Sequence, residues 1–136
     1  MNEEEQKNIL FQEGLSHYRS KDYFEAHESW EDLWSDYYLE DRKFVQGLIQ
    51  LAVSFVHLGN GNMNGAKSLL NKCTEKFKLF SGIHRDIDVN QLLDEISEVK
   101  KAYEKLGDAK DFDWSFVPKL DSVSYTHLTL PTKRIV

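Results

Sequence analysis

The chain has a single cysteine, no glycine-rich phosphate loop and no cluster of basic residues. One cysteine, Cys73, cannot form an internal disulfide, which argues against a secreted disulfide scaffold and favours a reducing cytoplasm. With a net charge of −6 and no basic face to neutralise phosphates, nucleic acid is not an expected partner. No apolar run reaches the length of a membrane span, and residues 1–6 lead into no signal-peptide core. We therefore predict a cytoplasmic protein that binds neither membrane nor nucleic acid.

What is present is the composition of a globular protein. Hydrophobic residues make up 40 % and charged residues 29 % of the 136 positions, a balance too apolar for a disordered chain and sufficient for one core. Residues 122–136 (SVSYTHLTLPTKRIV) contain no acidic residue, whereas residues 1–121 contain all 23. This stretch resembles a translated adaptor read-through, with a native terminal strand as the alternative. We predict one helical domain over 1–121 and a non-native or disordered tail over 122–136.

Removing the tail is expected to change the free energy of unfolding by less than ~1 kcal/mol, because a segment that did not evolve with a core has no reason to complement it. Thermal unfolding of residues 1–121 beside the full chain measures the difference. A larger loss, which would move the midpoint by several degrees in a domain of this size, would make the tail part of the fold.

Apolar residues recur at helical spacing in five segments. Four polar residues, Asp22, Asp41, Asn62 and Asp88, stand where a side chain can cap the helix that follows. The expected helices run from about 3 to 19, 22 to 37, 41 to 58, 62 to 77 and 88 to 106. Short loops make successive helices antiparallel neighbours. The pattern predicts an all-α fold, a compact bundle of about five antiparallel helices built from helical hairpins.

After the last helix the apolar period changes from that of a helix to two. Phe112, Trp114 and Phe116 alternate with polar residues before Pro118. Such alternation is typical of extended backbone. We expect an extended segment that packs back over the bundle.

The second helix carries a histidine among its apolar residues. On a helical wheel His27 falls inside the apolar arc beside Trp34, and Glu31 lies one turn further on, at the edge of that arc. A histidine and a carboxylate four residues apart are neighbours on a helix, so they can pair or share a ligand. Glu28 points further out, toward solvent. His27 and Glu31 are therefore the first candidates for a binding site.

The third helix has no formally charged residue between Phe44 and Leu58, as expected of a central helix. Gln46, Gln50 and His57 nevertheless line up in one narrow stripe. The stripe is either a solvent face or a face turned toward His27 and Glu31. We predict the second arrangement, in which the polar groups satisfy one another, water or an ion.

A converged cluster of this composition has two interpretations. It either fixes packing alone or holds a divalent metal such as zinc or manganese, for which His27, Glu31 and His57 supply three ligands and Gln46 and Gln50 a supporting shell. The run from His27 to Glu31 departs from the zincin HExxH by a glutamate in place of the second histidine, which removes the protease interpretation. If hydrolysis occurred, Glu31 or Glu28 would be the base for a metal-bound water.

The run His27-x3-Glu31-x2-Trp34 resembles the motif HxxxExxW of a bacterial and archaeal family, domain of unknown function three hundred and nine. The resemblance extends over residues 11 to 80 and includes the text around Tyr23–Glu28, Phe44–Gln50, His57 and Gly59–Ala66. It implies a compact helical fold and a metal-binding role for the motif residues, here His27 and Glu31 with Trp34 beside them. It implies no established reaction.

Two function classes follow. The first is a metal or small-ligand site on His27, Glu31 and His57. The second is a protein-interaction module in which the polar cluster is purely structural. Catalysis, substrate and a homo-oligomeric state are left open. Cys73 is expected in the core, and a loop role is left open for His84.

Overall fold

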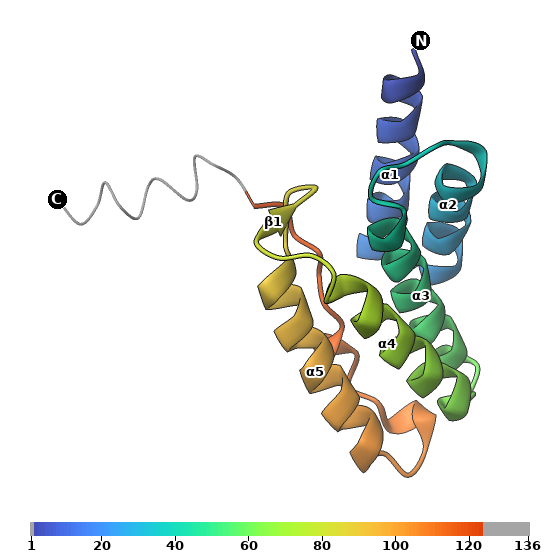
Figure 1. Cartoon of the computed structure of the whole chain (residues 1–136). Helices are drawn as coiled ribbons and strands as arrows, with labels where there is room; N and C mark the ends of the chain where they lie inside the picture. The colour runs from blue at the N-terminus through green and yellow to red at the C-terminus, as the bar shows by residue number, and fades with distance from the viewer. Residues whose placement is uncertain (1, 124–136) are drawn as a thin grey trace, which may run out of the picture.

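The computed structural model describes residues 2–123 and has five α-helices and one two-stranded sheet within them (Figure 1). Successive helices pack against one another, and α3 and α4 share the most extensive contact. This confirms the predicted all-α bundle. The elements are α1 (Glu3–Arg19), α2 (Tyr23–Asp36), α3 (Arg42–Gly59), α4 (Met63–Phe77), β1 (Ile83–His84), β2 (Ile87–Asp88), α5 (Val89–Lys105) and the 3-10 helices η1 (Ala109–Asp111) and η2 (Trp114–Phe116).

Three of the four predicted caps are formed. The side chains of Asp22, Asn62 and Asp88 each accept a hydrogen bond from the backbone N–H three residues further on, which satisfies a donor that the first turn of a helix leaves open. Asp41 precedes α3 but makes no such bond. Its carboxylate is engaged elsewhere, as described below.

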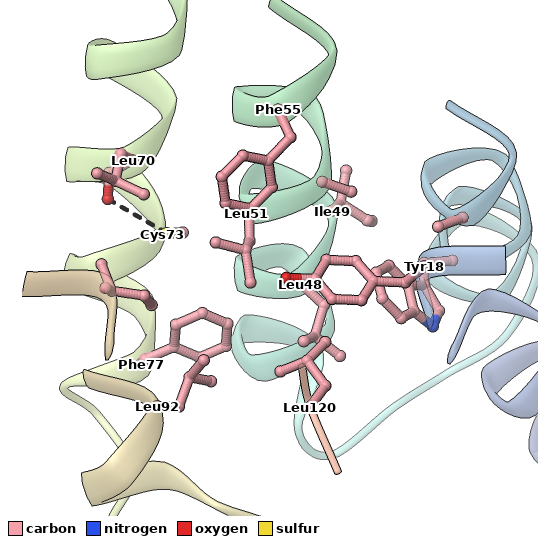
Figure 2. Close-up of a cluster of buried hydrophobic side chains, with 14 of the residues drawn as sticks. Tyr18, Leu48, Ile49, Leu51, Phe55, Leu70, Cys73, Phe77, Leu92 and Leu120 are labelled. Carbon is pink, nitrogen blue, oxygen red and sulfur yellow. Dashed lines mark hydrogen bonds between the residues drawn. The ribbon is translucent and has the colours of Figure 1, made fainter. Parts of the chain in front are cut away.

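The core lies between the α1–α2 hairpin, α3 and the α4–α5 pair. Figure 2 shows Leu48 and Leu51 of α3 beside Phe77 and Cys73 of α4, with Tyr18 on the other side; all five are buried. Cys73 thus lies in the core as expected, and burial raises the pKa of its thiol to about 12. The thiol is therefore an unreactive packing group at neutral pH.

The close approach of α1 and α2 depends on Gly14. A Cβ placed there would lie 2.1 Å from Nε1 of Trp30, which is fully buried and donates this N–H to the Phe11 carbonyl at 3.2 Å. The indole therefore occupies the volume that any other residue at position 14 would fill.

The segment after α5 packs back over the bundle, but not as extended backbone. Figure 1 shows it, in orange to red, returning from the end of α5 toward β1. Asp108 and Asp113 cap the turns η1 and η2, so the alternation of Phe112, Trp114 and Phe116 arises from two short 3-10 turns. Phe112 is buried, whereas the other two rings stay partly exposed. The prediction of an extended conformation was wrong because these local aspartate caps were overlooked.

Hydrogen bonds join the C-terminal segment to earlier parts of the chain. The Tyr18 hydroxyl donates to the Pro118 carbonyl at 2.6 Å, and Val123 N–H donates to the Asp86 carbonyl at 2.6 Å. Most of the tail predicted for 122–136 lies outside the described residues. Among residues 2–123, none of the helices has the length and hydropathy needed to cross a membrane.

Candidate functional site

His27 lies half-buried in the second turn of α2. Its Nδ1 is 3.0 Å from the carbonyl oxygen of Phe24, and its ring packs on the Phe24 ring with centroids 5.2 Å apart. A backbone carbonyl can only accept, so Nδ1 carries the proton and donates. In neutral His27 the lone pair therefore lies on Nε2, the arrangement of a metal-binding histidine whose other nitrogen is held by a carbonyl.

His57, in the last turn of α3, has the opposite tautomer. Its Nδ1 is 3.3 Å from Nδ2 of Asn62. The orientation of this amide is set by the cap, because the Asn62 Oδ1 accepts the Gly65 N–H at 2.9 Å. The amide therefore donates to Nδ1 of His57, and the neutral ring carries its proton on Nε2. In neutral His57 the Nε2 atom is therefore an N–H donor, whereas in neutral His27 the Nε2 atom has a lone pair.

The stripe on α3 is neither a solvent face nor part of the core. Gln46, Gln50 and His57 are all half-buried. The Oε1 atom of Gln50 is buried and has no hydrogen-bond partner, which leaves one acceptor of the stripe open. Within residues 2–123, no hydrogen bond joins His27 to any of these three side chains. That they face His27 stays a prediction.

The two glutamates next to His27 on α2 have the exposure expected from the helical wheel. Glu31 is half-buried and Glu28 is exposed. Trp34 donates its indole N–H to the Arg42 carbonyl at 3.1 Å, and the Arg42 guanidinium lies over its ring, 4.1 Å from the centroid. Trp34 therefore joins the end of α2 to the start of α3 and positions the face that carries His27.

The predicted ligands His27, Glu31 and His57 are not all gathered at one point. In the part of the chain that the structure describes, no three or more His, Cys, Asp or Glu side chains are grouped to hold a metal ion. His27, Glu31 and His57 therefore do not form a ready three-ligand site. His27 and Glu31, four residues apart on one helix, remain neighbours by helix geometry.

A second polar cluster was missed at the sequence level. Asp41, before α3, accepts two hydrogen bonds from Arg85, from Nε at 2.5 Å and from a terminal nitrogen at 3.0 Å. It also bonds Nε2 of His84 at 2.8 Å. Burial alone would raise the pKa of Asp41, but the bonds from Arg85 and His84 outweigh it and lower that pKa to about 2. This cluster ties the β1–β2 hairpin to the bundle.

The hairpin turn is held by the same contact. Arg85 and Asp86 have φ of 49° and 64°, the pair of positive values of a tight hairpin turn, which a residue with a Cβ adopts at a cost. The Arg85 guanidinium also lies over the Phe11 ring, 4.6 Å from its centroid, and the His84 ring packs 4.6 Å from the centroid of Phe44. The only sequence signal was the acidic residue at position 41, and its distance of 44 residues from Arg85 concealed the pairing.

Residues 11–69 match the model of a family described as a domain of unknown function (DUF309). The resemblance read from the HxxxExxW motif is confirmed for this segment. His27, Glu31, Gln50 and His57 all lie inside it, whereas His84 and Arg85 lie beyond it. No curated protein matches the chain.

Proposed function

We propose that the segment matching DUF309 holds a divalent cation, such as zinc or manganese, through Nε2 of His27 and the carboxylate of Glu31. The observation that carries this proposal is the 3.0 Å contact between Nδ1 of His27 and the Phe24 carbonyl. Because Nδ1 carries the proton, Nε2 has a free lone pair and can bind a metal without any change of tautomer.

Two further features support a cation rather than an anion. Glu31 adds a carboxylate one helical turn from His27, and imidazole with carboxylate is a donor set common to zinc and manganese sites. The open Oε1 acceptor of Gln50 suits either a metal-bound water or a ligand with an N–H or O–H group. Gln46 and Trp34 support the site from its edges in this proposal.

His57 has a different role in the proposal. Its lone pair is engaged with the Asn62 amide, so binding a metal through Nε2 would cost that hydrogen bond and a change of tautomer. We assign it the donor side of the site, where its Nε2–H holds a water or an oxygen of a bound small molecule. Two protein ligands leave the remaining coordination positions to water or substrate.

Replacing His27 by alanine is expected to weaken binding of Zn²⁺ or Mn²⁺ by at least about tenfold, because one of two protein ligands is lost. Glu31→Gln should weaken it comparably. Isothermal titration of tag-free protein, stripped of metal beforehand, measures both changes. Glu25→Gln is the matched control, since it removes the same charge from an exposed position of the same helix, and His17→Ala controls for loss of a histidine elsewhere.

The outcome for His57→Ala separates two coordination models. A small loss agrees with the donor role, whereas a loss as large as that of His27→Ala would place His57 among the ligands. If neither metal binds the wild type more tightly than His27→Ala, the metal proposal fails. The polar face would then serve packing alone, and the interaction-module hypothesis would take precedence, with the exposed rings of Phe24 and Tyr38 as the surface to test.

A further inference from the structure

A groove of about 560 Å³ lies where the turn between α1 and α2 meets the returning C-terminal segment. Its volume falls within the range of small-molecule sites. It is separate from the proposed cation site. Its lining includes Tyr18, Arg19, Lys21, Tyr23, Trp114 and Lys119.

Aromatic rings that are already held in place form its wall. The rings of Tyr23 and Trp114 are stacked, with centroids 6.0 Å apart and an angle of 15° between their planes. Phe55 packs behind both, 5.3 Å from Tyr23 and 6.2 Å from Trp114. Trp114 nevertheless keeps 38 % of its surface exposed. A ligand with a flat apolar body would cover this surface without reordering the rings.

The aromatic wall carries two polar groups, the Trp114 indole N–H and the Tyr23 hydroxyl. Trp30 and Trp34 donate their indole N–H groups to backbone carbonyls. Among the described residues, the Trp114 indole N–H and the Tyr23 hydroxyl donate to no protein group. Both groups are therefore free to donate to an acceptor on a bound molecule.

The rim of the groove is cationic although the chain is acidic. Arg19 is held by neutral acceptors, the Leu120 carbonyl and the Ser122 hydroxyl. Lys21 and Lys119 have no carboxylate within 4.0 Å in the region 2–123. Against these three cations the lining holds one carboxylate, that of Asp121. A local excess of positive charge in a chain of net charge −6 favours an anionic ligand.

We propose that this groove binds a small aromatic anion, with its ring on Trp114 and Tyr23 and its carboxylate or sulfonate between Lys21 and Lys119. The aromatic wall supplies dispersion and apolar burial, and the two ammonium groups with the Trp114 N–H select the charged end. Only Tyr18, Arg19, Lys21 and Tyr23 of the six named residues lie within the segment that matches the family, so the site depends on the C-terminal part of this chain.

Titration of ¹⁵N-labelled full chain with naphthalene-2-sulfonate tests the proposal, with neutral naphthalene-2-sulfonamide as the matched probe. The three tryptophan indole signals give an internal comparison. We expect the Trp114 signal to shift saturably while the signals of Trp30 and Trp34, which are tied to carbonyls inside the bundle, stay in place. The sulfonamide should bind about tenfold more weakly, because it lacks the charge that the rim recognises.

The double variant Lys21→Asn/Lys119→Gln should weaken sulfonate binding about tenfold. Asparagine is chosen because Lys21 has a φ of 68°, which asparagine tolerates. Lys72→Gln/Lys78→Gln removes the same charge from exposed positions on and after α4 and should leave affinity unchanged. The proposal is overturned if the Trp114 signal does not saturate, if both probes bind equally, or if the two double variants weaken binding alike.

Discussion

Gly14→Ala is expected to lower the free energy of unfolding by about 3 kcal/mol, at the upper end of what one added methyl group costs in a packed interior. The added Cβ would lie 2.1 Å from Nε1 and 2.4 Å from Cδ1 of Trp30. The indole cannot move aside cheaply, because it is fully buried, packs on Phe11 and Tyr18 and would leave its N–H unpaired. Urea unfolding followed by circular dichroism measures the loss.

Gly59→Ala is the matched control for this substitution. It makes the same change within a helix, and a Cβ at position 59 meets no atom within 4 Å. Because Gly59 is the last residue of α3, helix propensity predicts a gain there smaller than the ~1 kcal/mol of a helix interior. The double variant Gly14→Ala/Trp30→Phe should cost less than the sum of its parts, since the smaller ring removes the collision. Additive losses would show that the contact with Trp30 is not the cause.

Asp41→Asn is expected to lower the free energy of unfolding by about 2 kcal/mol at neutral pH, between the values for surface and buried ion pairs. The Asp41 side chain is only 14 % exposed and that of Arg85 24 %, so removal of the carboxylate leaves a guanidinium partly desolvated without its partner. It also removes the contact that holds the strained hairpin turn. Asp32→Asn, at an exposed position of α2, controls for the change of charge.

The Asp41–Arg85 ion pair also predicts how the free energy of unfolding changes with pH. The folded-state pKa of Asp41 is lowered from 3.8 to about 2, so the unfolded chain binds the proton more readily. Its contribution to stability is complete above about pH 4 and is lost as the pH falls toward 2. The difference between wild type and Asp41→Asn should therefore narrow over that interval in urea unfolding measured at each pH. A constant difference would contradict the ion pair.

The local features of this fold were predictable from the sequence, whereas the partners of its polar groups were not. Asp22 and Asn62 act as caps because the amide that each satisfies lies three residues away, within reach of a local pattern. Asp41 has the same appearance, but Arg85 and His84, more than 40 residues later, compete for its carboxylate and win. A hydrogen bond from a charged donor is stronger than one from a neutral backbone amide.

The same limit applies to the candidate site. Helix periodicity placed His27 inside the apolar arc and Glu31 at its edge, and the structure leaves both side chains half-buried. Helix periodicity could not predict the histidine tautomers. The tautomer of His57 depends on the Asn62 amide, which is oriented by the first turn of the next helix. Which histidine offers a lone pair is therefore a property of tertiary structure.

The Tyr18–Pro118 hydrogen bond joins residues 100 positions apart, and this separation has a consequence for how the chain is made. Contacts between successive helices are local and form quickly, whereas closure by the C-terminal segment must wait until that segment exists. On the ribosome, the hairpin of α1 and α2 can pair long before residue 118 is translated. Until then the Tyr18 hydroxyl lacks its acceptor, the Pro118 carbonyl, and the core position later filled by Leu120 stays empty. Before residues 118–120 are synthesised, the paired helices therefore expose part of the core. At this stage the protein is most open to misassociation or to capture by a chaperone.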